Sequence, residues 1–265
     1  MMRPRVIPVL LLKGDGLVKG TRFKDYAYLG DPINAVHIFD EKEVDELIFL
    51  DITATRENRV PGIEYIAGIA DECYMPFAVG GGIRNVEQIR TLLHAGAEKI
   101  SLNTAAMENP GLITEAANLF GSQSVVVSID VRKGWGSSYQ VYTHSGTKRT
   151  NFDPVQWAIR AAELGAGEIL ITSIDHDGTM SGYDLNLVQQ VSQTVSIPVV
   201  ACGGAGRVEH FAEAIHHGAS AVAAGSMFVF HGKRRAVLIS YPAEAELQKA
   251  FGGQADHPPG TQNRS

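Results

Sequence analysis

Residues 75–105, MPFAVGGGIRNVEQIRTLLHAGAEKISLNTA, decide the fold because their pattern occurs twice in the chain. It returns at residues 197–227 as IPVVACGGAGRVEHFAEAIHHGASAVAAGSM, an offset of about 120 residues. A shorter pair, DELIFLDI from Asp45 and GEILITSI from Gly167, keeps the same spacing. The matched positions are Pro76 with Pro198, Gly81 and Gly82 with Gly203 and Gly204, Gly96 with Gly218, and Thr104 with Ser226. The chain is therefore expected to consist of two equivalent halves.

Short β-branched runs alternate with longer helical patterns along the whole chain, which is typical of repeated βα units. Eight strands are predicted, at Val6–Leu11, Glu46–Asp51, Pro76–Val79, Lys99–Leu102, Ser124–Asp130, Glu168–Ser173, Pro198–Ala201 and Ala221–Ala224. A helix should follow each of them, at Pro32–Lys42, Gly62–Glu72, Val86–His94, Pro110–Phe120, Pro154–Leu164, Leu185–Val195, Val208–His216 and Arg234–Lys249. The prediction is an α/β fold, a (β/α)8 TIM barrel built from two repeated half-barrels, with an open doubly wound sheet as the alternative.

The domain organisation expected from this pattern is simple. Residues 1–250 should form a single barrel domain, and residues 251–265, rich in glycine, proline and polar residues, should form a disordered tail. The segment 131–150, VRKGWGSSYQVYTHSGTKRT, interrupts the βα pattern and predicts a hairpin over the mouth of the barrel.

Composition excludes several classes of function. A net charge of -6 and a pI near 5.8 argue against nucleic acid as the main partner, because phosphate backbones select clustered Lys and Arg. The apolar run VIPVLLL near the N-terminus is broken by Pro8, and no stretch approaches the roughly 18 apolar residues of a membrane span. Two well-separated cysteines, Cys73 and Cys202, fit reduced thiols. We therefore expect a cytoplasmic protein with no membrane contact.

Two glycine clusters follow strands at matching places in the two halves, VGGGI and CGGAG. A small polar strand end comes after each, LNT at Leu102–Thr104 and AGS at Ala224–Ser226. Glycines let backbone N–H groups approach an anion closely, and the following helix adds its positive N-terminal dipole. Each half is thus predicted to hold one phosphate group, which implies a phosphorylated small molecule as ligand. The alternative is that the glycines only make tight turns.

Acid/base residues are expected at the carboxyl ends of strands, where the working residues of such barrels lie. Asp130 closes the fifth strand and is the best candidate, while Asp51 and Asp177 are further candidates. A strand-end aspartate such as Asp130 or Asp51 could instead cap the next helix or pair with a lysine. By the repeat, the counterpart of Asp130 is the last residue of the first strand, which is Leu11. The nine histidines and two cysteines show no metal-ligand spacing, so neither a metal nor a cofactor is expected.

A set of motifs resembles a known family. The segments RVIPVLLLKGDGLVKGTRF, GDPI, DELIFLDITA, VGGGI, ISLNTAAMENPGLI, FGSQSVVVSID, GAGEILITSIDHDGTMSGYD and ACGGAG are similar to the cyclase subunit (HisF) of imidazole glycerol phosphate synthase. The similarity spans Arg5 to about Phe230. It implies a two-fold repeated barrel that docks a glutaminase subunit at its N-terminal face as a heterodimer. Ammonia would cross the lumen and react at the opposite mouth with a bisphosphorylated ribonucleotide, in histidine biosynthesis.

The resemblance also implies roles for individual residues. Asp130 would be the general acid/base, and Lys19 would belong to a mobile first loop. The phosphate sites would be Gly82, Asn103 and Thr104 in one half, and Asp177, Gly178, Gly204, Gly225 and Ser226 in the other. The ammonia gate, on the face that meets the partner, would be Arg5, Glu46, Lys99 and Glu168.

Leu11 departs from the family, which has its second essential aspartate at this position. A divergent branch with leucine-rich first strands resembles this chain also in the ending AAGSMFVFHGKRRAVLISYP. That branch occurs with surface-polysaccharide (O-antigen, lipopolysaccharide) gene sets. Its barrel and glutaminase would supply ammonia to a third, ATP-using amidotransferase-like protein that forms an acetamidino sugar.

Three hypotheses follow. The first is an ammonia-conducting amidotransferase subunit in acetamidino-sugar formation. The second is the ordinary cyclase of histidine biosynthesis, a lyase, with another carboxylate replacing the missing one. The third is a non-catalytic barrel that only activates a glutaminase. Leu11 favours the first and third, whereas the paired phosphate sites favour the first and second.

Overall fold

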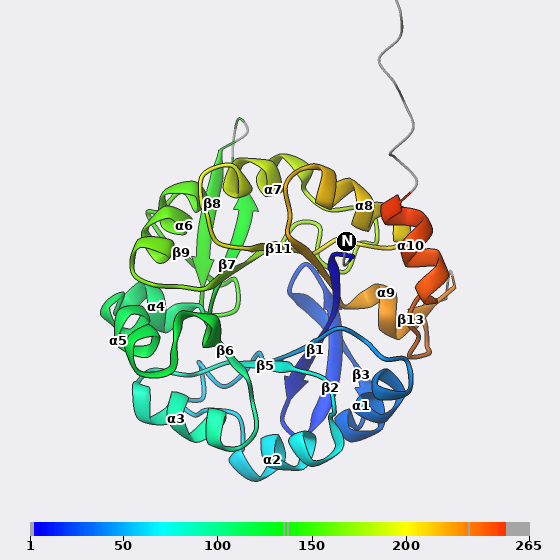
Figure 1. Ribbon diagram of the computed structural model, residues 1–265, viewed down its shortest axis with the longest axis horizontal. Helices are drawn as coiled ribbons and strands as arrows, with labels where there is room; N and C mark the ends of the chain where they lie inside the picture. The colour runs from blue at the N-terminus through cyan, green and yellow to red at the C-terminus, as the bar shows by residue number, and fades with distance from the viewer. Residues whose placement is uncertain (1–2, 135, 137, 233, 253–265) are drawn as a thin grey trace, which may run out of the picture.

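Eight parallel strands close into a barrel in the computed structural model, which describes residues 3–134, 136, 138–232 and 234–252. Each strand pairs with the next along the chain, β7 pairs with β10, and β12 pairs with β1, so the ring is complete (Figure 1). The barrel strands are β1 (Arg5–Lys13), β4 (Leu47–Asp51), β5 (Phe77–Gly80), β6 (Lys99–Leu102), β7 (Val125–Lys133), β10 (Glu168–Ser173), β11 (Val199–Cys202) and β12 (Ala221–Ala224). The predicted (β/α)8 barrel is confirmed, and all eight predicted strands are present with small shifts at their ends.

Helices surround the barrel and follow its strands (Figure 1). The side chains of Asp31, Asn85, Asp153 and Asp184 accept hydrogen bonds from the first free backbone N–H groups of four of them, which defines where those helices begin. The helices are α1 (Pro32–Glu41), α2 (Ile63–Glu72), α3 (Val86–His94), α4 (Thr104–Glu108), α5 (Gly111–Phe120), α6 (Pro154–Glu163), α7 (Leu185–Ser192), α8 (Val208–His216), α9 (Ser226–Val229) and α10 (Glu244–Gly252), with a 3-10 turn η1 at Ser122–Ser124.

The core has two separate apolar layers. The larger layer lies between the strands and the helices and includes Phe39, Phe49, Trp157 and Phe228. The smaller layer fills the barrel interior with Ile7, Val9, Leu11, Val18, Ile48, Ala78, Val126, Leu170, Val200, Cys202, Ala221 and Ala223. Because alternate residues of a strand face opposite sides, the same strands supply both layers.

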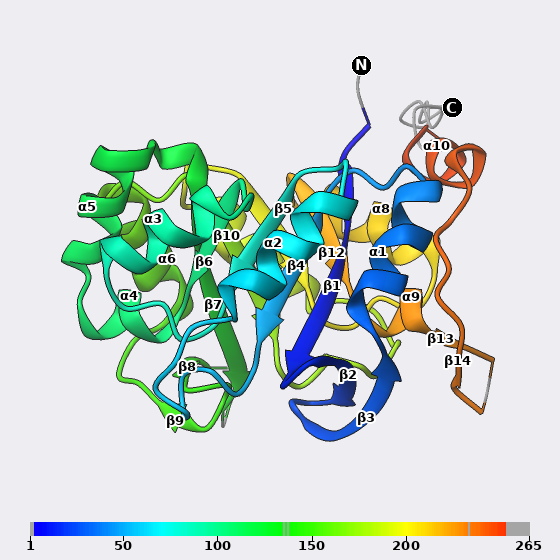
Figure 2. The same ribbon diagram turned by 90° about the horizontal axis from the view of Figure 1, so that it is seen from below.

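Two hairpins leave the carboxyl end of the barrel, and the sequence predicted only one of them. The expected first loop instead forms β2 (Gly16–Thr21) and β3 (Lys24–Gly30), with β2 antiparallel to β1. The hairpin predicted within residues 131–150 is confirmed, since β8 (Tyr139–Thr143) pairs with β7 and with β9 (Lys148–Arg149). Figure 2 shows both hairpins at the end to which the strand arrows point.

The helix predicted at Arg234–Lys249 is wrong over its first half. There the chain forms a small hairpin of β13 (Phe230–His231) and β14 (Ala236–Val237). Helix α10 begins only at Glu244, because Pro242 disfavours a helical conformation in the residue before it. The helix ends at Gly252, two residues past the expected end of the domain, and the tail predicted beyond it lies outside the described residues. No helix in the described part of the chain is long and apolar enough to span a membrane.

Candidate functional site

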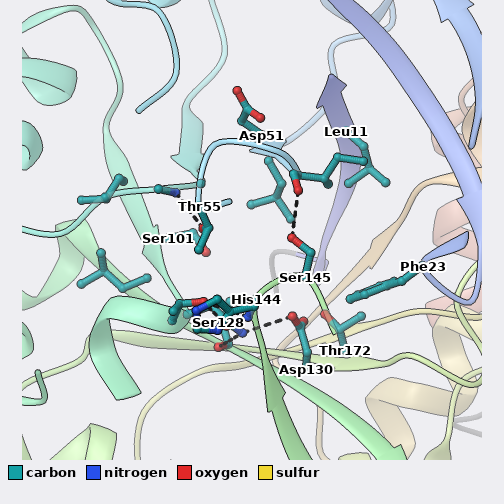
Figure 3. A pocket seen from close by; sticks show the side chains of 18 of the residues that line it. Leu11, Phe23, Asp51, Thr55, Ser101, Ser128, Asp130, His144, Ser145 and Thr172 are labelled. Atoms are coloured by element: carbon teal, nitrogen blue, oxygen red, sulfur yellow. Dashed lines mark hydrogen bonds between the residues drawn. The ribbon is translucent and has the colours of Figure 1, made fainter. Parts of the chain in front are cut away.

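A cavity of about 200 Å³ opens at the carboxyl ends of the strands (Figure 3). The hairpins β2–β3 and β8–β9 lie at the same end of the barrel (Figure 2). Strand ends from both halves and both hairpins contribute to the wall of the cavity. The residues that line the cavity include Val9, Leu11, Lys19, Tyr26, Asp51, Thr55, Gly82, Asn103, Thr104, Asp130, His144, Ser145, Asp177, Cys202 and Gly225. The cavity therefore brings together most of the predicted mouth residues.

Asp130, the predicted acid/base group, lines this cavity. It lies on β7, and its carboxylate accepts a hydrogen bond of 3.1 Å from Asn103 Nδ2. Burial, together with the negative charge of Asp177, raises the pKa of Asp130 from the ordinary 3.8 to about 7. A carboxyl group with such a pKa can take up and release a proton near neutral pH. The acid/base role of Asp130 stays a prediction, and a pKa near neutrality is what that role requires.

Leu11 faces Asp130 across the cavity. Strands β1 and β7 stand four places apart in the ring of eight, so their ends lie on opposite sides of the barrel (Figure 3). The Leu11 side chain is buried with Val9 and Val18, and its backbone pairs with Leu50 and Val18. The position equivalent to Asp130 is therefore fully apolar and offers no proton.

Lys19 and Asp177 form a buried ion pair at the side of the cavity. Lys19 Nζ lies 2.8 and 3.0 Å from the two carboxylate oxygens of Asp177, and both side chains are nearly inaccessible. Lys19 belongs to strand β2 rather than to a loop. Its pairing joins the first hairpin to the loop after β10 and leaves Asp177 unavailable as a free acid.

The first predicted phosphate site has its polar groups in use within the chain. Gly82 N donates to Thr55 Oγ1 at 3.3 Å, and Thr104 Oγ1 accepts from His144 N at 3.0 Å. Asn103 Nδ2 is bound to Asp130 and to the carbonyl of Ser128. All three predicted residues line the cavity, but the side-chain amide of Asn103 already donates a hydrogen bond to Asp130.

The second predicted phosphate site lies deeper. Gly225 borders the cavity, whereas Gly178, Gly204 and Ser226 do not line it. Gly204 has a φ of +121°, and a Cβ atom there would stand 2.0 Å from the carbonyl oxygen of Gly182. Gly82, its counterpart in the first half, has a φ of +68°, and a Cβ atom there would stand 1.9 Å from the carbonyl oxygen of Arg59. Chain packing alone therefore requires both glycines, so their presence does not by itself show phosphate binding.

Asp51, the alternative acid, has a structural role. Its carboxylate accepts from the backbone N–H groups of Thr53 and Ala54 at 3.0 Å and pairs with Arg59 at 2.5 Å. These contacts fix the loop after β4. Asp51 is thus not a free acid/base.

The four predicted gate residues form a closed ring at the opposite end of the barrel. Arg5 pairs with Glu46 and Glu168, and Lys99 Nζ lies 2.8 Å from Glu46 and 3.1 Å from Glu168. Both carboxylates are buried. Each cation thus binds both anions. Because all four residues stand at or next to the first residue of a barrel strand, the ring lies over the amino end of the apolar interior.

Several residues of the cavity wall were not predicted. Tyr26 comes from β3, and burial with the charges of Asp177 and Asp130 raises its pKa to about 12. His144 and Ser145 come from the turn of the β8–β9 hairpin, and Ser145 Oγ donates to the carbonyl of Ile52 at 2.9 Å (Figure 3). Burial raises the pKa of the Cys202 thiol to about 12, so it stays protonated. Only the hairpin prediction could have located His144 and Ser145.

No group of three or more His, Cys, Asp or Glu residues suited to a metal ion occurs among the residues that the structure describes.

These features define a two-fold repeated (β/α)8 barrel with a buried carboxyl group of raised pKa at its mouth and an ion ring at its base. Residues 5–234 match the model of the family described as "Histidine biosynthesis protein". The chain belongs to this family, and it is similar to the HisF subunits of imidazole glycerol phosphate synthase.

Three curated relatives illustrate the similarity. One from Pseudomonas aeruginosa, named "Putative imidazole glycerol phosphate synthase subunit hisF2", is 52% identical over 243 residues, 91% of this chain and 97% of the relative. One from Vibrio vulnificus, with the same name but hisF3, is 47% identical over 253 residues, 95% of this chain and 97% of the relative. "Imidazole glycerol phosphate synthase subunit HisF" from Hydrogenobaculum is 48% identical over 244 residues, 92% and 94% of the two chains.

Proposed function

We propose that this chain is the barrel subunit of a glutamine amidotransferase that docks a glutaminase and conducts ammonia, in acetamidino-sugar formation for O-antigen or lipopolysaccharide biosynthesis. The observation that carries this proposal is the contrast between the two ends of the barrel. The ion ring of Arg5, Glu46, Lys99 and Glu168 is complete, whereas the mouth has Leu11 where a second carboxylate would be needed.

The lumen has the chemistry that ammonia transfer requires. Between the ring and the mouth the barrel interior is filled by apolar side chains such as Ile7, Ala78, Val126, Ala221 and Ala223. A low-dielectric interior disfavours an ammonium ion but not neutral ammonia. The ring at its base supplies charged groups where a glutaminase would dock. These features support conduction from the ring toward the mouth.

The ammonia acceptor is the part of the proposal that depends on Leu11. Loss of a positioned acid/base group costs typically 10²–10⁴-fold in rate, so cyclisation of a bisphosphorylated ribonucleotide is disfavoured. Ammonia leaving the mouth would instead reach the ATP-using amidotransferase-like protein, which activates the acetamido group. Sequence identity does not distinguish the proposed function from the cyclase, because relatives named hisF2 or hisF3 and one named HisF are all between 47 and 52% identical to this chain.

The ordinary cyclase of histidine biosynthesis is the second candidate. It is favoured by Asp130, whose pKa of about 7 suits proton transfer, and by the cavity of about 200 Å³ in front of it. A barrel that only activates a glutaminase is the third candidate, and the filled hydrogen bonds of the first phosphate site favour it.

Reconstitution with the glutaminase encoded in the same genome tests the proposal. The mixture is assayed for glutamine hydrolysis and for cyclisation of the bisphosphorylated ribonucleotide, with glutamine or with an ammonium salt. We expect the barrel to stimulate glutamine hydrolysis without cyclisation. Turnover at the rate of a HisF enzyme would overturn the proposal in favour of the cyclase. Addition of the amidotransferase-like protein with ATP and the acetamido sugar should then yield the acetamidino product, and failure of this step would leave only the glutaminase activator.

A further inference from the structure

Arg235, in the turn between β13 and β14, contacts two residues of the second predicted phosphate site, Gly178 and Ser226. Its Nη2 donates to the carbonyl of Gly178 at 3.0 Å and to Ser226 Oγ at 3.2 Å, and its Nη1 donates to Thr21 Oγ1 at 3.1 Å. The guanidinium also stacks over the ring of Phe230, 4.6 Å from the ring centre. One side chain thus joins the first hairpin, the loop after β10 and the start of α9.

The surroundings of this guanidinium lack an anion. Nε of Arg235 is inaccessible and has no hydrogen-bond partner among the described residues. Within the same part of the chain no carboxylate lies at ion-pair distance from it, whereas Lys19, the cation on the other side of this region, is paired with Asp177. A buried charged donor without an acceptor is costly, so the site favours an anion that completes it.

The groups around Arg235 are suited to donate to that anion. Ser226 Oγ accepts a hydrogen bond from Arg235, which leaves its own proton free to donate to a further oxygen. Gly225, next to Ser226, borders the cavity, and Lys19 Cε passes so close to it that a Cβ atom there would stand 2.9 Å away. A guanidinium and a hydroxyl together form a pair of donors typical of phosphate recognition.

We propose that Arg235 is a ligand-binding residue of the second phosphate site, where its guanidinium binds the dianionic phosphate group of a phosphorylated small molecule. This inference goes beyond the proposed function, which assigns no phosphorylated ligand, and builds on the second phosphate site that the sequence predicts. Arg235 lies outside the repeated segments 75–105 and 197–227, so the first half has no equivalent charged residue at its phosphate site. Arg235 has a φ of +51°, an unusual backbone conformation for a residue with a side chain, and its three hydrogen bonds hold it there.

Titration of the isotopically labelled full chain with inorganic phosphate, followed by amide NMR shifts, tests this proposal. We expect Arg235→Ala to weaken binding at the amides of Gly178, Gly204 and Ser226 about tenfold or more, because it removes a charge-assisted contact. Arg235→Lys should retain part of the affinity. The amide shifts of Gly82 and Thr104 report the first site in the same sample, and their response to phosphate should not change with the substitution at Arg235.

A neighbouring arginine provides the matched control. Arg234 is exposed in the same turn, so Arg234→Ala removes an equal charge without touching the site and should leave binding unchanged. Unchanged phosphate binding in a folded Arg235→Ala variant overturns the proposal. Tighter binding also overturns it and shows that the guanidinium occupies the place of the anion. Absence of any phosphate-dependent shift at the second site of the natural chain does the same, while glutaminase stimulation tests the proposed function separately.

Discussion

The two half-barrels share a sequence pattern but meet different surroundings at the mouth. In the first half, Thr104 Oγ1 accepts from the backbone of His144, so the turn of the β8–β9 hairpin covers the glycine cluster. In the second half, Ser226 Oγ accepts from Arg235, so a charged side chain reaches the equivalent place. Both partners come from hairpins outside the repeated segments. Duplication thus supplies two similar frames, and the unrepeated hairpins make them different.

The strand ends at the mouth differ in the same way, whereas the ring at the opposite face keeps one equivalent pair of residues. Leu11 and Asp130 occupy equivalent places on β1 and β7, one apolar and one with a pKa near 7. Glu46 and Glu168 also occupy equivalent places, and both bind Arg5 and Lys99. The two halves therefore supply equivalent glutamates to the ring, but both of its cations come from the first half, since Lys99 matches Ala221 in the repeat.

Restoring the carboxylate at position 11 should have the largest effect. Leu11→Asp is expected to raise ammonium-dependent cyclisation at least tenfold, because a positioned acid/base group contributes typically 10²–10⁴-fold. Glutaminase stimulation should stay unchanged, since Leu11 lies at the mouth and the ring at the other end. Leu11→Asn is the control, being of equal size without a titratable proton. If Leu11→Asp gives no gain over Leu11→Asn, other parts of the mouth also differ from what cyclisation requires.

Substituting either glutamate of the ring should lower the free energy of unfolding by nearly the same amount. Glu46→Gln and Glu168→Gln are each expected to lower the free energy of unfolding by about 3 kcal/mol, because each leaves two cations sharing one buried carboxylate. Urea denaturation measures this, with the exposed Glu98→Gln, next to Lys99, as a control expected to change it by less than about 0.5 kcal/mol. A large effect from only one of the two glutamates would show that the ring is not symmetric.

Replacing Asp130 should change how stability depends on pH. Its pKa is about 7 in the folded chain and near the ordinary 3.8 when unfolded, so the folded state binds more protons between these values. Its contribution to stability therefore falls as the pH rises from 4 through 7. Asp130→Asn should increase the free energy of unfolding by on the order of 2 kcal/mol at pH 8 and by little at pH 4. Denaturation at both pH values tests this, and an equal change at each would contradict it.

The smallest effect is expected at the ends of β4 and β10. Asp51 pairs with Arg59, whereas Ser173, its counterpart in the repeat, contacts His176 Nδ1 at 2.8 Å. Arg59→Ala should cost about 1 kcal/mol of unfolding free energy, since the arginine is partly exposed and Asp51 keeps two backbone donors. Arg84→Ala, an exposed arginine at the same rim, is the control. Equal thermal unfolding of the two variants would remove the role assigned to Asp51.

The elements that the sequence predicted correctly are those with a local signal. The apolar runs that lead to Asp51, Asp130 and Ser173 are strands because they are short, nearly continuous and rich in β-branched residues, as in a parallel sheet buried on both faces. The hairpin of β2 and β3 was missed, because GDGLVKGT has glycines and charges that are typical of a loop, and its pairing with β1 supplies the order. The helix expected from Arg234 was displaced by a hairpin whose strands also pair beyond any local pattern.

The amino-acid sequence alone determined the two-fold repeat, the eight strands and the place of Asp130 and Leu11, because these depend on residue type and spacing within short segments. Tertiary structure alone decided that Asn103 binds Asp130, that Lys19 pairs with Asp177 and that Arg235 meets Thr21 and Ser226. Arg235 and Thr21 are 214 residues apart in the chain. Contacts between such distant residues depend on closing the barrel and docking its hairpins, and no local pattern of residues encodes them.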